Sequence, residues 1–138
     1  MLELLPRLYN EIWTPRVVVE EYQAKSPPDE PNLTQNSWLT IVDTVRINSS
    51  LPLLDAGEAA AISLAQTVDA RLLLVDERKA RRIAVQLGLP IAGTLAVLLR
   101  AKQQGHLVAL RPYLIRMQAQ GRRFHPDLIA RVLSEAGE

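Results

Sequence analysis

Asp76 stands at a position where carboxylates often do chemistry. It directly follows a short apolar run, Leu72–Val75, and a charged amphipathic segment follows it. In open α/β sheets, ligands bind beyond the carboxyl ends of the strands, so this order makes Asp76 a candidate ligand for a cation. The alternative is that Asp76 caps the following helix, since aspartate is strongly preferred at that position. The two roles are compatible.

Glu58 is the second candidate, within Asp55-Ala56-Gly57-Glu58-Ala59. A cap residue followed three positions later by glutamate resembles a capping box, so a structural role accounts for Glu58 about as well as a chemical one. Gly57, however, is a poor helix former for a first turn. Its presence indicates that another group approaches the backbone there, which capping alone would not require.

An acidic pair, Glu20-Glu21, follows the valine run Val17–Val19. Taken alone, the pair is typical of a solvated helix start, because acidic side chains favour a helix N-terminus.

Basic residues crowd the segment after Asp76. Such a run usually forms a solvated helix face, but beside an acidic metal site it would also suit contacts to a phosphate backbone. Gly93-Thr94, at a strand-to-helix turn, is either a phosphate-binding turn or an ordinary cap. The candidates for phosphate contacts are Arg78, Lys79, Arg81 and Thr94, and the sequence leaves open whether Arg100, Lys102, Arg122 and Arg123 extend the patch.

Composition restricts the possible chemistry. The chain has 138 residues, 48% of them hydrophobic, which suits a single domain over residues 1–138. Sixteen basic and fifteen acidic residues give a net charge of +1, so nucleic acid would have to bind through a local patch. Without cysteine there is no disulfide or thiolate site, and a metal held by carboxylates would be Mg²⁺ or Mn²⁺. With no signal peptide or membrane span in view, we expect a soluble cytoplasmic protein.

Several elements must position these candidates. In the first half we expect a helix over residues 2–10, a break at Pro15, a helix over 17–22, a loop over 26–37 and a strand or extended segment over Trp38–Ile47. Further on, a helix from Asp55 precedes Leu72–Val75, which reads as a strand buried on both faces of a parallel sheet.

The remainder of the chain continues the alternation. A helix with the core face Ala80, Ile83, Ala84 and Leu87 ends at Gly88, and Leu89–Ala92 is a second short strand. Three more helices are expected, from Gly93-Thr94 to Gly105, around Pro112 up to Gln120, and over Pro126–Ala136. Alternating helices and strands predict an α/β fold, with a small parallel sheet flanked by helices.

Three stretches in this order and spacing resemble a known family: Leu54–Ala65 with its Gly-Glu-Ala, Leu72–Arg81 with its Val-Asp-Glu-Arg, and Leu87–Leu95 with its Gly-Thr. Together they are similar to a branch of the PIN-domain superfamily, related to toxin ribonucleases of prokaryotic toxin–antitoxin pairs. The resemblance implies carboxylates that converge on one or two Mg²⁺ or Mn²⁺ ions and cleave RNA. It assigns Glu58, Asp76 and Glu21 to the metal and catalytic positions, with Glu20 as the alternate to Glu21.

The resemblance departs from the family at the N-terminus. Members begin with a central strand that carries an aspartate, whereas this sequence starts at the helix that follows it. Three explanations compete. The true start codon lies further upstream, the chain is a natural remnant without nuclease activity, or a second copy of the chain completes the fold. Because unpaired backbone groups are costly to bury and an open edge invites pairing, we expect a homodimer or a rearranged sheet.

Two functions follow from these observations. The leading hypothesis is a metal-dependent ribonuclease of the toxin type, with RNA and an antitoxin protein as partners and weak or no activity in this chain. The alternative is a non-catalytic binding or assembly module in which Glu58 and Asp76 are caps. A nucleotide-binding protein is disfavoured, because the sequence lacks a glycine-rich phosphate loop.

Overall fold

The structure, a computed structural model, describes residues 1–28 and 32–138. It divides into two compact units, one formed by residues 9–92 and the other by residues 1–8 together with 93–138. Each unit is treated by itself below. In the described ranges, no helix is both long enough and apolar enough to cross a membrane.

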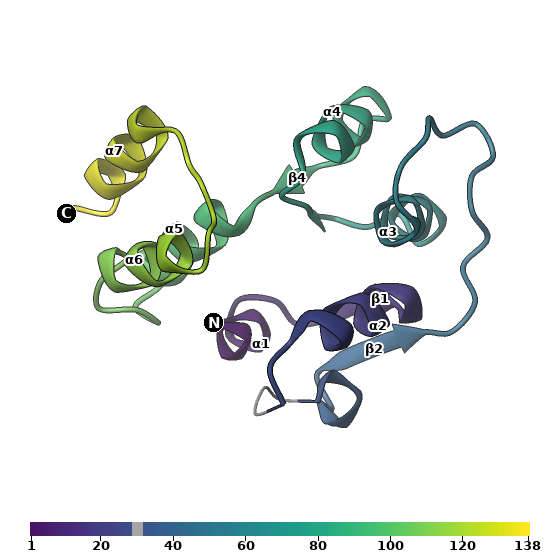
Figure 1. The fold of residues 1–138 in the computed structure, drawn as a ribbon, viewed down its shortest axis with the longest axis horizontal. Helices are drawn as coiled ribbons and strands as arrows, with labels where there is room; N and C mark the ends of the chain where they lie inside the picture. Colours follow the sequence, from purple (N-terminus) through teal and green to yellow (C-terminus); the bar gives the residue numbers. More distant parts are fainter. Residues whose placement is uncertain (29–31) are drawn as a thin grey trace. The chain divides into compact units, whose positions relative to one another are not determined.

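The unit of residues 9–92 is α/β, as predicted, and all its strand pairs are parallel (Figure 1). β1 pairs with β2 and β3 pairs with β4, so the strands form two pairs and not the one sheet that was expected. Its elements are β1 (Ile12–Pro15), α2 (Arg16–Lys25), the 3-10 turn η2 (Leu33–Gln35), β2 (Leu39–Val42), α3 (Ala56–Thr67), β3 (Leu73–Leu74), α4 (Arg78–Gln86) and β4 (Ile91–Ala92).

Strand β1 was not predicted from the sequence. Pro15, expected to be a simple break, is both the last residue of β1 and the N-cap of α2. Proline suits that junction, because it needs no ladder hydrogen bond there and its fixed φ leads into a helix. The partner strand is shorter than the extended segment Trp38–Ile47 that was predicted. The loop predicted over residues 26–37 includes the turn η2, and its residues 29–31 lie outside the described part.

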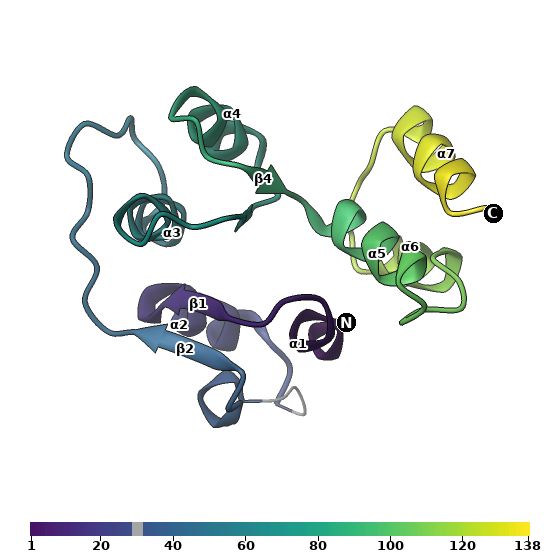
Figure 2. The ribbon, with the colours of Figure 1, turned by 180° about the vertical axis from the view of Figure 1, so that it is seen from behind.

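Helix α3 is the central element of this unit. It packs against α2, β1, β3 and α4, and Figure 2 shows it from the opposite side. Most of its residues are small or apolar, which lets neighbouring elements approach closely. The core residues that α3 shares with β3 and α4 are Ile62, Ala65, Leu73, Ala80, Ile83 and Ala84.

Two leucines in this region were predicted to be buried and are exposed. Leu73 belongs to the core, but Leu74 is 37% exposed, so β3 is not buried on both faces. Successive strand side chains point to opposite faces, and only the Leu73 face is covered. Leu87 is 40% exposed because it is the C-cap of α4 and lies outside its apolar stripe. Gly88 ends α4 as predicted, with a φ of +76°.

The other unit is helical. The helix predicted over residues 2–10 is a 3-10 turn, η1 (Leu2–Leu4), that continues into α1 (Leu5–Leu8) and ends before β1. The remaining three helices were predicted, with slightly wider bounds. They are α5 (Thr94–Gln103), α6 (Arg111–Ala119) and α7 (Pro126–Glu135). The buried apolar residues of α5–α7 and their connections are Leu95, Val97, Leu98, Ala101, Leu110, Leu114, Met117 and Val132.

Glu138, the last residue of the sequence, caps the start of helix α6. Its carboxylate accepts hydrogen bonds from the backbone N–H of Leu110 at 2.7 Å and of Arg111 at 3.3 Å. It also forms an ion pair with Lys102 of α5 at 3.0 Å. The Leu110 hydrogen bond is the main reason that the pKa of Glu138 is lowered from its ordinary value of 4.5. An acid at a helix N-terminus satisfies amides that the helix leaves unpaired.

We expect Glu138→Gln to lower the melting temperature at neutral pH. A lowered pKa means that ionised Glu138 stabilises the fold above its ordinary pKa, and that this stabilisation is lost as the pH falls through the folded-state pKa. In thermal unfolding followed by circular dichroism, the difference in melting temperature between the variant and the wild type should therefore be full at pH 7 and decrease as the pH is lowered below 4.5. Glu135→Gln, on the exposed end of α7, is the control. An equal decrease in that control would contradict the capping role.

Candidate acidic pocket

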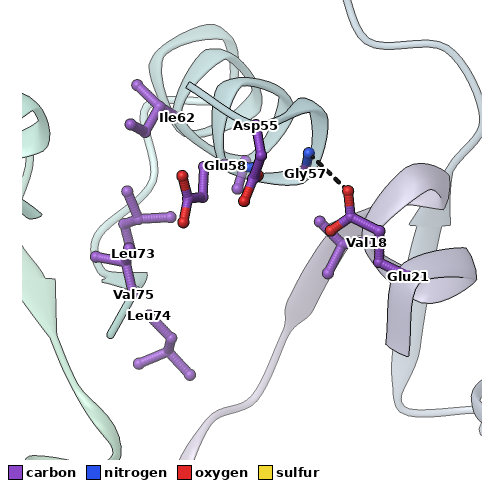
Figure 3. Close-up of a pocket in the computed structure, with 10 residues that line it drawn as sticks. Val18, Glu21, Asp55, Gly57, Glu58, Ile62, Leu73, Leu74 and Val75 are labelled. Atoms are coloured by element: carbon purple, nitrogen blue, oxygen red, sulfur yellow. Dashed lines mark hydrogen bonds between the residues drawn. The ribbon is translucent and has the colours of Figure 1, made fainter. Parts of the chain in front are cut away.

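Glu21 reaches from α2 to the first turn of α3. Its carboxylate accepts a hydrogen bond from the backbone N–H of Gly57 at 3.1 Å (Figure 3). A Cβ on Gly57 would collide with that carboxylate. The approach to the backbone that Gly57 indicated is therefore confirmed, and the approaching group is a side chain of the same chain.

An open pocket of about 210 Å³ lies beside this contact. It is bounded by α2, by the first turns of α3 and by β3 (Figure 3). Its walls combine apolar side chains with carboxylates, and no lysine or arginine of the described residues lines it. The lining residues are Val18, Glu21, Asp55, Gly57, Glu58, Ala61, Ile62, Leu73, Leu74 and Val75.

Glu58 extends from α3 toward β3 across this pocket (Figure 3). Its backbone N–H donates to the Asp55 carboxylate at 2.9 Å, which makes Asp55 the N-cap of α3. The predicted cap before Glu58 is thus confirmed. The cap residue is also a second carboxylate on the pocket, a role that was not predicted for Asp55.

Burial is the main cause that raises the pKa of the Glu58 carboxyl above its ordinary value. The negative charges of Asp55 and Glu77 raise it further, while a hydrogen bond from the Asp55 backbone acts in the opposite direction. Like charges close together disfavour ionisation of each other. Glu58 is therefore held where a positive charge would stabilise it.

Asp76 follows Val75, which lines the pocket, but Asp76 itself does not line it. It is not the cap of α4 either. Glu77 is the N-cap, and its carboxylate accepts from the Ala80 backbone N–H at 2.8 Å. The helix begins one residue later than the capping interpretation of Asp76 required, so that interpretation is wrong.

Two of the predicted phosphate-binding residues have structural contacts. The Arg81 guanidinium donates to the Val75 carbonyl at 2.9 Å, and the Lys79 ammonium donates to the Leu53 carbonyl at 2.6 Å. These hydrogen bonds hold α4 against Val75, which lines the pocket, and against the segment that precedes Asp55. Arg78 is exposed at the start of α4.

Thr94 belongs to the other unit. It is 9% exposed at the start of α5, and its hydroxyl accepts from the Arg122 guanidinium at 3.5 Å. The Arg122 guanidinium also lies 5.4 Å from the centroid of the Phe124 ring. These contacts are consistent with a packed helix start. Whether Thr94 meets phosphate stays a prediction.

The carboxylates fit a divalent ion in part. Asp55 and Glu58 are neighbours with oxygen ligands of the kind that Mg²⁺ and Mn²⁺ prefer, and Mg²⁺ is commonly held by one or two carboxylates and several waters. One oxygen of Glu21 is already hydrogen bonded to Gly57. Among residues 1–28 and 32–138, no three acidic or histidine side chains converge closely enough to hold an ion together.

Parallel strand pairs with helical connections, and a pocket lined by carboxylates at the N-terminus of a helix, define a small α/β protein with an acidic site. The DUF3368 family model, described as a PIN domain, matches residues 1–138. The chain therefore belongs to this family of PIN domains. Neither the curated proteins nor the solved structures that were searched gave a match.

Gly57→Ala should separate the role of the Glu21 contact from helix propensity. Alanine favours the helix by about 1 kcal/mol, but its Cβ must displace the Glu21 carboxylate, which removes a hydrogen bond worth about 1 kcal/mol or more. We expect a net change near zero in the wild type and stabilisation of about 1 kcal/mol in a Glu21→Ala background. Urea unfolding of the four proteins measures this coupling, and strictly additive changes would contradict it.

Glu58→Gln should raise stability at neutral pH. Because the folded-state pKa of Glu58 is raised, its ionised form destabilises the fold above that pKa, and the effect disappears when the carboxyl is protonated at low pH. Thermal unfolding at pH 7 and near pH 3 checks this, with Glu20→Gln at an exposed position of α2 as the control. A lower melting temperature at pH 7 would show instead that Glu58 serves as a cap.

Proposed function

We propose that this chain is a metal-dependent ribonuclease domain of the PIN type, with weak activity by itself. The observation that carries the proposal is the pocket at the N-terminus of α3, where Asp55 and Glu58 are adjacent and Glu21 is held beside them. Membership of a family with a nuclease-type fold supports it. The proposed site residues are Glu58, Glu21 and Asp76, together with Asp55.

Each carboxylate has a distinct part in this proposal. Glu58, with its raised pKa, would be the principal ligand, since a bound cation would stabilise its ionised form. Asp55 would add a second oxygen while it caps α3. Glu21 would hold the first turn of α3 through Gly57 and offer its other oxygen to the site. When bound, Mg²⁺ or Mn²⁺ supplies a water of lowered pKa and stabilises negative charge on phosphate oxygens.

Weak activity follows from the number of ligands. Fewer carboxylates hold less negative charge against the cation, so its affinity falls. Asp76, next to the pocket wall at Val75, does not itself line the pocket and so would add less to the site. The chain would therefore bind the ion loosely and hydrolyse RNA slowly.

The proposal extends to partners and location. RNA would be the substrate, with Arg78, Lys79, Arg81 and Thr94 as candidate phosphate contacts. An antitoxin protein or a second copy of the chain would bind near the acidic pocket, in a cytoplasmic setting. The unpaired edge of β3 supports association of this kind, because free strand edges pair readily with other chains.

A non-catalytic binding module is the second candidate. The observation that favours it is that three metal ligands do not converge within the described residues. In that case the pocket would recognise a partner, and the carboxylates would set its charge preference.

Titration of the protein with Mn²⁺, followed by calorimetry, tests the proposed nuclease. We expect one weak site, with affinity reduced at least tenfold in Glu58→Gln because the principal ligand is lost, and unchanged in Glu20→Gln. Cleavage of a fluorescent single-stranded RNA in Mn²⁺ should decrease in parallel. If Glu58→Gln and Glu20→Gln bind Mn²⁺ equally well, the acidic pocket is not the metal site and the binding module is favoured.

A further inference from the structure

A second pocket lies in the unit of residues 9–92, at the ends of strands β1 and β2. The two strands are parallel, and their last residues, Pro15 and Val42, are register partners. Both residues line the pocket, so it opens at the carboxyl ends of the strands, where open α/β sheets bind ligands. Its volume of about 420 Å³ falls within the usual range of roughly 300–1,000 Å³ for small-molecule sites. It shares no lining residue with the acidic pocket.

Aliphatic side chains form most of the wall of this second pocket. Ala56, Ala59 and Ala60 line it from α3, and they lie on one side of that helix because residues three and four apart share a face. The start of α2 and the segment after β2 add larger apolar side chains, those of Val17, Val42, Val45 and Ile47. No aromatic side chain of the described residues lines the pocket. A branched aliphatic group therefore fits it better than a nucleobase, which binds single-stranded sites by stacking.

Two side chains of opposite charge also line the second pocket. The Arg16 guanidinium and the Asp43 carboxylate form an ion pair, and they are 43% and 72% exposed. Exposed ion pairs contribute little to stability, so a ligand can separate this one at low cost. A ligand with only a negative charge would be repelled by Asp43, and one with only a positive charge by Arg16. A ligand that carries both charges side by side would form a charge-assisted hydrogen bond with each residue.

We propose that this second pocket binds a free α-amino acid with an aliphatic side chain. An α-amino acid has a carboxylate and an ammonium on one carbon beside an apolar chain, which is the arrangement that the wall complements. The Arg16 guanidinium, a planar group suited to carboxylates, donates to the ligand's carboxylate. The ligand's ammonium donates to Asp43, and its side chain packs against the alanines of α3. The inference goes beyond the proposed nuclease and holds whether or not the domain cleaves RNA.

Titration of the full chain with L-leucine, followed by calorimetry, tests the proposal. We expect one saturable site, and a melting temperature that rises with the leucine concentration because the ligand binds the folded state. Three analogues isolate the groups that are recognised: isocaproate lacks the ammonium, isoamylamine lacks the carboxylate, and glycine lacks the aliphatic side chain. Each should bind at least tenfold more weakly than leucine. Failure of leucine to bind saturably, or binding of any of the three analogues as tightly as leucine, would overturn the proposal.

Protein variants locate the site. Arg16→Gln and Asp43→Asn should each weaken leucine binding at least tenfold, because each removes one charged partner. Arg46→Gln, in the same segment as Asp43 but outside the pocket lining, is the control and should bind leucine as the wild type does. Ala59→Leu fills the hollow and should abolish binding, and if that variant does not fold, the three analogues decide. If Arg16→Gln and Arg46→Gln bind leucine equally well, leucine occupies another site and the proposal is wrong.

Discussion

The hydrogen bond between the Glu21 carboxylate and the Gly57 amide joins the two parts of the strand-containing unit. No backbone ladder connects the β1–β2 pair with the β3–β4 pair within residues 9–28 and 32–92. Helices must therefore hold them together, and α3 does so by packing against α2, β1 and β3. Such a hydrogen bond contributes about 1 kcal/mol or more to stability. Gly57 is needed because any side chain at that position would displace the carboxylate.

The same contact determines the geometry of the pocket. The Glu21 carboxylate accepts from the Gly57 amide at the start of α3, and the Asp55 carboxylate accepts from the Glu58 amide. The Glu58 side chain is directed toward β3. Three carboxylates thus gather near one helix N-terminus, where the helix dipole partly offsets their mutual repulsion. The remaining repulsion adds to burial, which is the main cause, in raising the pKa of Glu58. Perturbed pKa values occur at functional sites and also in structural networks of charges.

The sequence predicted the second half of the fold better than the first. Helices α3 and α4 have periodic apolar residues and clear end signals, and Leu72–Val75 and Leu89–Ala92 both contain strands. Strand β1 was missed because it is four residues long, ends in proline and carries Trp13, which is 44% exposed. The division into two strand pairs depends on contacts between distant residues, which local patterns do not encode.

The candidate site was predictable only in its residue types. Glu58 and Gly57 carried usable signals, since a glycine in a first turn indicated the close approach that Glu21 makes. The choice between Glu20 and Glu21 depended on how α2 faces α3, and the structure places Glu21 on the pocket. Aspartate is the preferred N-cap residue, so the sequence favoured Asp76, whereas the structure uses its neighbour Glu77.

Capping and chemistry are not alternatives for this group of acids. Asp55 and Glu77 satisfy the amides at the starts of α3 and α4, and both also raise the pKa of Glu58. The caps that begin the two helices therefore add negative charge around Glu58. A fold that needed these acids for capping alone would gain stability by replacing Glu58 with a neutral residue. In the proposed function, a bound cation would give Glu58 a role beyond its part at the start of α3.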